Sequence, residues 1–186
     1  MKRIILLALF IALLLSISGC SVNDSSQPEQ THIDIDETTF DCTYQDIVNC
    51  FMAESLNYSE IGTNQFSDDE SLVSGVIYMS DNEYEICRVK IRTYGTRVFQ
   101  VYVNYDISGD EVGYEKFRVL LKCIVKTIKP ELPDTYIDEL NKNSEDYYSN
   151  DYQDLRITLQ FSEKYLGEGI LGTAVDCYFV HLDWAK

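Results

Sequence analysis

One glycine-rich run has the spacing of a nucleotide-binding turn. Residues 167–172 read Gly-Glu-Gly-Ile-Leu-Gly and match the Gly-x-Gly-x-x-Gly pattern. Dinucleotide binding needs a helix directly after these glycines, because the N-terminus of that helix holds the pyrophosphate. The residues from Ala174 to Leu182 are instead typical of a β-strand. We therefore interpret the run as a turn between two strands and expect no nucleotide cofactor.

A thiol nucleophile would need an imidazole within hydrogen-bonding reach. The chain has two histidines, His32 and His181. Cys177 and His181 stand four residues apart on the predicted strand, which separates them by roughly 13 Å. We therefore expect no thiolate–imidazole pair, and interpret His181 as a structural or edge residue.

The acidic residues form no specific catalytic or metal-binding pattern. The 31 Asp and Glu residues are spread along the chain, so no carboxylate pair stands out as the two-carboxylate arrangement of a glycosidase. The clusters at residues 34–36 and 68–70 lack the glycine and the terminal Glu of a calcium-binding EF-hand loop. No two cysteines have the Cys-x-x-Cys spacing of a zinc site. We expect no metal ion and no catalytic residue among them.

The amino terminus has the organisation of an export signal. Lys2 and Arg3 precede an apolar run from Ile4 to Leu15, and small residues follow. A basic start, a short apolar run and a small-residue cleavage zone are typical of a secretory signal peptide. The apolar run is shorter than the ~20 residues that a membrane-spanning helix needs.

Residues 17–20, Ile-Ser-Gly-Cys, resemble the lipobox of bacterial lipoproteins. The resemblance implies that a diacylglyceryl group is attached to the thiol of Cys20 and that a signal peptidase cleaves between Gly19 and Cys20. It implies a protein anchored by lipid at the outer side of the cytoplasmic membrane, since two or more acyl chains anchor firmly. Two alternatives remain: ordinary cleavage after Ser18, which would release the protein, and an uncut anchor.

Charge excludes one class of partner. The chain carries 15 Lys and Arg against 31 Asp and Glu, a net charge of −16. Loss of residues 1–19 removes Lys2 and Arg3 and leaves a net charge of −18. Such a chain is unsuited to nucleic acid, whose phosphates need basic partners, and to lying flat on anionic lipid. The lipid anchor is then the contact with the membrane.

Five cysteines remain after Cys20, namely Cys42, Cys50, Cys87, Cys123 and Cys177. An odd number leaves at least one of them unpaired. Several fall on predicted apolar faces, where free cysteine behaves as a small hydrophobe. Buried thiols are our main interpretation, and one disulfide is the alternative. A Cys42–Cys50 bond is disfavoured, because about two helical turns would separate the two residues.

The pattern predicts three regions: a signal peptide (1–19), a lipidated cysteine with a flexible polar tether (20–39) and a single α+β domain (40–186). Helices are expected at 44–56, 108–129 and 134–141, with loops at 57–70 and 142–154. Strands are expected at 73–79, 85–94, 98–105, 155–162 and 174–182. The order αβββααββ predicts an antiparallel five-stranded sheet with helices packed on one face.

Strand register can be predicted where two strands are joined by a short loop. A loop of residues 95–97 pairs Ile91 with Val101 and Val89 with Val103, which keeps the apolar side chains on one face. We therefore expect a three-residue loop, with Phe99 on the same face as Val101 and Val103.

The other face of the predicted sheet is basic and rich in hydrogen-bonding groups. It carries Arg88, Lys90, Arg92, Tyr102 and Arg156, together with Gln100, Asn104, Thr158 and Gln160. An ordinary solvated face is one interpretation. The sharper hypothesis is a recognition surface for an anionic ligand or a protein partner. We expect a membrane-anchored, non-catalytic binding module, and the alternative is a small envelope-acting hydrolase with unidentified carboxylates.

Overall fold

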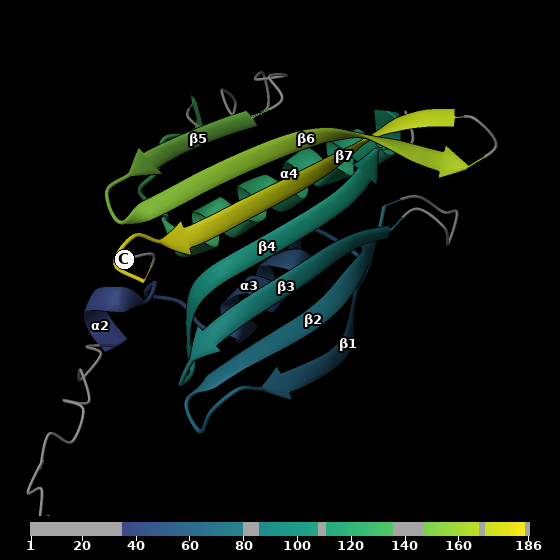
Figure 1. The fold of residues 1–186 in the computed structure, drawn as a ribbon. Helices are drawn as coiled ribbons and strands as arrows, with labels where there is room; N and C mark the ends of the chain where they lie inside the picture. The colour runs from purple at the N-terminus through teal and green to yellow at the C-terminus, as the bar shows by residue number, and fades with distance from the viewer. Residues whose placement is uncertain (1–34, 80–85, 108–110, 136–146, 168–169, 185–186) are drawn as a thin grey trace, which may run out of the picture. The chain divides into compact units, whose positions relative to one another are not determined.

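The computed structural model describes residues 35–79, 86–107, 111–135, 147–167 and 170–184 of the 186-residue chain. Within these ranges the chain is predominantly β, with seven strands in one antiparallel sheet and two helices longer than a single turn (Figure 1). The prediction of an α+β fold with a five-stranded sheet in the order αβββααββ is therefore wrong.

The sheet has the strand order β1-β2-β3-β4-β7-β6-β5. All neighbouring strands are antiparallel. The connection from β4 to β5 contains α4 (Glu111–Ile128), and β7 returns to pair with β4. The strands are β1 (Tyr58–Gln65), β2 (Glu70–Tyr78), β3 (Ile86–Tyr94), β4 (Arg97–Ile107), β5 (Tyr147–Tyr152), β6 (Leu155–Gly167) and β7 (Ile170–His181).

The two unpredicted strands, β1 and β5, lie at the two edges of the sheet. Both fall in segments that the sequence predicted as loops. Most β1 side chains are exposed, and so are most of those on β5. An edge strand with two solvated faces has no apolar alternation to detect, so a period-of-two search misses it.

The helix α3 (Tyr44–Ala53) begins as its sequence predicts. The hydroxyl of Thr43 accepts a hydrogen bond from the Asp46 amide at 3.2 Å, and the Asp46 carboxylate accepts one from the Thr43 amide at 2.8 Å. This capping box satisfies two amides that the helix itself leaves unpaired. The first residues of the predicted helix at 108–129, and most of the predicted helix at 134–141, lie outside the described residues.

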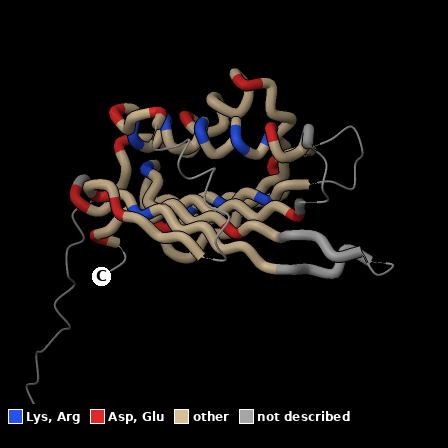
Figure 2. The backbone as a smooth tube through the Cα atoms, turned by 90° about the horizontal axis from the view of Figure 1, so that it is seen from above, with Lys and Arg blue, Asp and Glu red and all other residues tan. Residues whose placement is uncertain are grey.

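The two helices α3 and α4 lie on the same side of the sheet (Figure 2). Ile47 and Phe51 of α3, and Leu120 and Ile124 of α4, are buried in one apolar cluster with the sheet. The strands contribute side chains from alternate positions on the side that faces the helices: Cys87, Val89, Ile91, Val101, Val103, Tyr105, Leu155, Ile157, Leu159, Val175, Cys177 and Phe179. The opposite face of the sheet carries mainly polar and aromatic side chains, with aliphatic ones at Leu72 and Val180.

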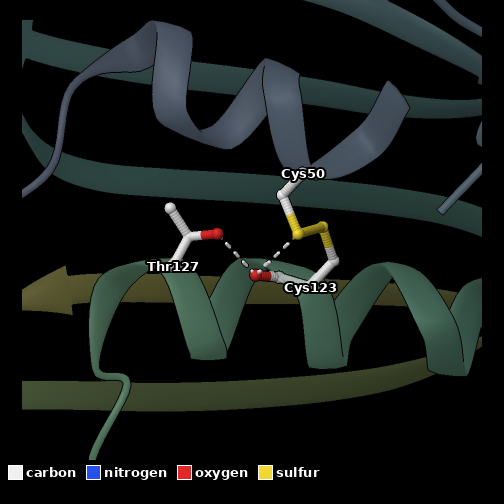
Figure 3. Close-up of a disulfide and its surroundings, with 3 residues drawn as sticks. All are labelled: Cys50, Cys123 and Thr127. Carbon is white, nitrogen blue, oxygen red and sulfur yellow. Dashed lines mark hydrogen bonds between the residues drawn. A yellow bond between two sulfur atoms is a disulfide. The ribbon is translucent and has the colours of Figure 1, made fainter. Parts of the chain in front are cut away.

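A disulfide between Cys50 and Cys123 joins α3 to α4 (Figure 3). The two Cα atoms are 6.0 Å apart, within the usual range for a disulfide. The hydroxyl of Thr127 donates to the Cys123 carbonyl oxygen at 2.9 Å, and the Cys50 sulfur lies 3.6 Å from the same oxygen. The structure thus has the single disulfide that the sequence left as the alternative.

The other three cysteines that the structure describes, Cys42, Cys87 and Cys177, are buried free thiols. Burial raises the pKa of Cys42 to about 12 and the pKa of Cys87 and Cys177 well above the ordinary value. A thiol held neutral in this way is a poor nucleophile. These three residues act as small core side chains, as the sequence indicated.

Candidate binding face

The sheet face directed away from the helices, here called the outer face, consists of rows of cross-strand neighbours. The strand registers place Lys90, Tyr102 and Tyr178 in its central row. One flanking row contains Arg88, Asn104 and Asp176, and the other contains Leu72, Arg92, Gln100, Val180 and Arg156. The five residues predicted for a binding face therefore all belong to it, and they come from the three strands β3, β4 and β6.

A hollow of about 370 Å³ lies on the outer face. A volume of this size is within the range of small-molecule sites. Its lining comes from β2, β3, β4 and β7: Leu72, Lys90, Arg92, Gln100, Tyr102 and Tyr178. Three of the predicted residues, Lys90, Arg92 and Tyr102, meet there.

Arg92 is held by several neighbours. Its guanidinium forms an ion pair with Glu70 and donates to the Gln100 side-chain oxygen at 3.2 Å. It also lies 5.0 Å from the Phe99 ring centre and 5.9 Å from that of Phe66, within the distance of a cation–π contact. Arg92 therefore has a fixed geometry, and Glu70 compensates its charge.

Lys90 differs from Arg92 because no carboxylate of the described residues lies within ion-pair distance of its ammonium group. The Lys90 nitrogen is 5.7 Å from the centre of the Tyr102 ring. The side chain is exposed, so its charge remains available to a ligand.

Tyr102 belongs to a hydrogen-bond network centred on Asp176. Its hydroxyl donates to an Asp176 carboxylate oxygen, and Asn104 donates to the same oxygen at 3.0 Å. Arg88 donates to the Asn104 side-chain oxygen at 3.4 Å. Burial, the hydrogen bond to Asp176 and the charge of that residue raise the pKa of Tyr102, so the hydroxyl stays protonated. The Tyr178 ring packs against it at a centroid distance of 4.8 Å.

Arg156 is not part of the hollow. It lies on β6, separated from the Arg92 position by β4 and β7. Two of its nitrogens donate to the two carboxylate oxygens of Asp151 on β5, at 2.7 and 3.0 Å. A paired arginine this far from Lys90 does not add to the charge at the hollow.

The β3–β4 turn changes which aromatic residues reach the outer face. The predicted pairing of Ile91 with Val101 is confirmed. The turn, however, has two residues, and the register shifts at a bulge, since Arg92 pairs with Gln100 but Thr93 pairs with Val98. Gly95 has a φ of +59°, which suits a tight turn. The bulge directs Val98 into the core cluster and leaves Phe99 outside it.

Trp184 covers Phe99, with ring centroids 3.9 Å apart and planes stacked at 25°. It is the single tryptophan of the chain. This contact was not predicted. The sequence pattern places Phe99 on the core face, because it does not reveal the bulge.

Asp176, Tyr178 and Glu70 were also missed by sequence reasoning. Tyr178 and Asp176 reach the site because β7 pairs with β4, which comes more than 60 residues earlier in the chain. Glu70 lies in the segment predicted as a loop. The alternation in β7 could have indicated two of them, because Asp176 and Tyr178 stand two residues apart on the strand and so share a face.

The described residues do not form the other sites considered from the sequence, namely a nucleotide-binding turn, a histidine-based catalytic pair and a metal site. Gly167 ends β6 and Ile170 begins β7, so a strand rather than a helix follows the first glycines. His181 is buried, and its Nε2 lies 3.3 Å from Asp154. Burial lowers the pKa of His181, while Asp154 opposes that effect. Among the described residues no group of three or more His, Cys, Asp or Glu side chains could hold a metal ion.

A second hollow, of about 570 Å³, lies beside the helices and includes two carboxylates, Glu54 and Glu115. Both side chains are exposed, and Glu115 accepts a hydrogen bond from Arg118 at 3.0 Å. The general acid of a glycosidase is shielded from solvent, and neither of these exposed carboxylates is. Nothing in this hollow favours the hydrolase alternative.

The lipobox residues Gly19 and Cys20 lie outside the described residues. Within the described part of the chain, no helix combines the length and the apolar character needed to cross a membrane. Comparisons with protein-family models, with curated proteins and with solved structures found no match to this chain.

Proposed function

We propose that this protein is a membrane-anchored binding module, held by lipid on Cys20 at the outer side of a bacterial cytoplasmic membrane. The lipobox resemblance at residues 17–20 and the polar tether after it support the anchor. The disulfide between Cys50 and Cys123 is consistent with an exported protein, because disulfides persist in oxidising compartments.

The binding site in this proposal is the hollow on the outer face, and its ligand is anionic. The observation that carries the proposal is the hollow itself, where the ammonium group of Lys90, which no described carboxylate pairs, lies over the ring of Tyr102, and the Tyr102 ring packs against that of Tyr178. A fixed scaffold surrounds it, because Arg92 and Tyr102 are held by Glu70 and Asp176. Rigid side chains around one free charge reduce the ordering cost of binding.

Crosslinking in intact cells tests the binding site. A photoreactive residue at Gln160, exposed on the outer face, is compared with one at Val119, exposed on α4. We expect adducts of defined mass at Gln160 that disappear when Lys90→Glu is added. Identical adducts from both positions, or adducts at Gln160 unaffected by Lys90→Glu, would contradict the proposal. Lys116→Glu, a charge reversal on α4, is the matched control.

The anchor is tested separately by mass spectrometry of the natural protein. We expect a mature amino terminus at Cys20 with acyl chains on it, and loss of membrane association in Cys20→Ala. A mature terminus at another residue, or a free thiol at Cys20, would remove the anchor from the proposal.

A further inference from the structure

We propose that the ligand of the outer face is a monoanionic saccharide, a pyranose that bears one carboxylate. This inference rests on the binding function proposed above and specifies its ligand class. It follows from the charge balance at the hollow, from the tyrosine pair, and from the polar groups around that pair that remain free to bond.

The charge balance selects a ligand with a single negative charge. Within the hollow, Glu70 compensates Arg92, so Lys90 is the cation left to bind an anion. Asp176 lies in the adjacent row, hydrogen-bonded to Tyr102 and Asn104. Its carboxylate offsets the charge of Arg88 in the same row, so that row offers no net positive charge to a second negative group on the ligand. The net charge of −16 also disfavours polyanions, because it repels them before contact.

The tyrosine pair supplies a surface for a flat, partly apolar ligand. Tyr102 and Tyr178 are both half-buried, and their rings meet at 4.8 Å with planes tilted by 39°. The C–H groups on one face of a pyranose pack well against such rings, while its hydroxyls point outward. Aromatic side chains with a polar end suit a ligand of this mixed character.

Hydrogen-bonding groups near the rings match sugar hydroxyls. Gln100 uses its side-chain oxygen to accept from Arg92, which leaves its amide nitrogen to donate. Asp176 accepts both of its hydrogen bonds from described residues at one oxygen, which leaves the other to accept from a hydroxyl. The volume of about 370 Å³ is near the lower end of small-molecule sites and suits one or two sugar rings.

Binding measurements on the full mature protein, purified from membranes in detergent, test the inference. The probes are galacturonate and glucuronate, each a pyranose with one carboxylate, with galactose and inorganic phosphate as controls, each followed by calorimetry up to about 10 mM. We expect the uronates to bind, and galactose and phosphate to bind at least about tenfold more weakly, since a hydrogen bond to a charged group contributes that much. Trp184 fluorescence gives a second readout, because that ring stacks on Phe99 beside Arg92.

Two variants locate the ligand. Lys90→Met should lower uronate affinity about tenfold or more by removing the charged partner. Tyr178→Leu should lower it about threefold to tenfold by removing a ring from the stacking surface. Lys116→Met, on α4, is the matched control and should leave the affinity unchanged. Circular dichroism establishes that each variant is folded.

The outcomes separate this inference from the function on which it rests. No uronate binding, equal binding of phosphate or galactose, or uronate binding that Lys90→Met leaves unchanged would overturn the saccharide assignment. The proposed function would still stand if cellular crosslinking at Gln160 depended on Lys90, and it would fail if that crosslinking did not.

Discussion

Breaking the disulfide between Cys50 and Cys123 should lower the free energy of unfolding by about 2–4 kcal/mol. The two cysteines are separated by 73 residues in the sequence. In the chain-entropy model a bond closing a loop of that length restricts the unfolded chain by about 4 kcal/mol at 25 °C, and measured effects are usually smaller. The bond also joins α3 to α4, so its loss affects the layer that covers the core face of the sheet.

Urea unfolding with and without a reductant measures the effect. Circular dichroism reports the sheet, and Trp184 fluorescence reports the outer face beside β7. Free energies rather than midpoints should be compared, because the reduced unfolded chain is less compact and steepens the denaturant dependence. The Cys50→Ala/Cys123→Ala variant should unfold like the reduced protein, and the reductant should not affect it.

Two results would refute this reasoning. One is an intact mass of the unreduced protein that shows both thiols free. The other is a bond that is present but whose reduction changes the free energy of unfolding by less than about 0.5 kcal/mol, the range of ordinary surface changes. The second result would mean that the unfolded chain is already restricted without the bond.

Three further changes should alter stability measurably. Gly75→Ala should destabilise by about 1–3 kcal/mol, because a Cβ there would overlap the Tyr58 ring; unchanged urea unfolding would show that the ring moves freely. Thr43→Ala should cost about 1 kcal/mol through the lost α3 cap, and Thr43→Ser should restore most of it. Burial lowers the pKa of His181, so the unfolded chain takes up its proton first. The contribution of His181 to the free energy of unfolding should therefore be fully present above about pH 6.5 and be lost as the pH falls through the native pKa. A His181→Gln variant whose free energy of unfolding depends on pH in the same way would contradict this assignment.

The central part of the sheet could be predicted from the sequence. Alternation in β3 and β4 fixed the pairing of Ile91 with Val101, because any other register exposes apolar side chains. The turn length was wrong, since a bulge after a two-residue turn gives the same register as a longer loop. Only the position of Phe99 distinguishes the two arrangements, and a bulge has no signal in the hydrophobic pattern.

The predicted binding residues do lie on one face, but their charges could not be assessed from the sequence. Arg92 and Arg156 appear as free cations in the sequence, and the structure pairs them with Glu70 and Asp151. Both acidic partners lie in segments predicted as loops, on β2 and on the unrecognised edge strand β5. Ion pairs across a sheet depend on which strands are neighbours, and that order is set by long-range pairing rather than by local pattern.

Both edge strands of the sheet have features that disfavour pairing with another chain. β1 and β5 each leave one row of backbone amides and carbonyls without a strand partner, and such rows can pair with another chain. β1 is interrupted by an irregularity between Glu60 and Gly62, and β5 carries the charge of Asp151 and several polar side chains. Under the proposed lipid anchor, copies of the protein would meet on one membrane at high local concentration, and polar, irregular edge strands would limit strand pairing between them.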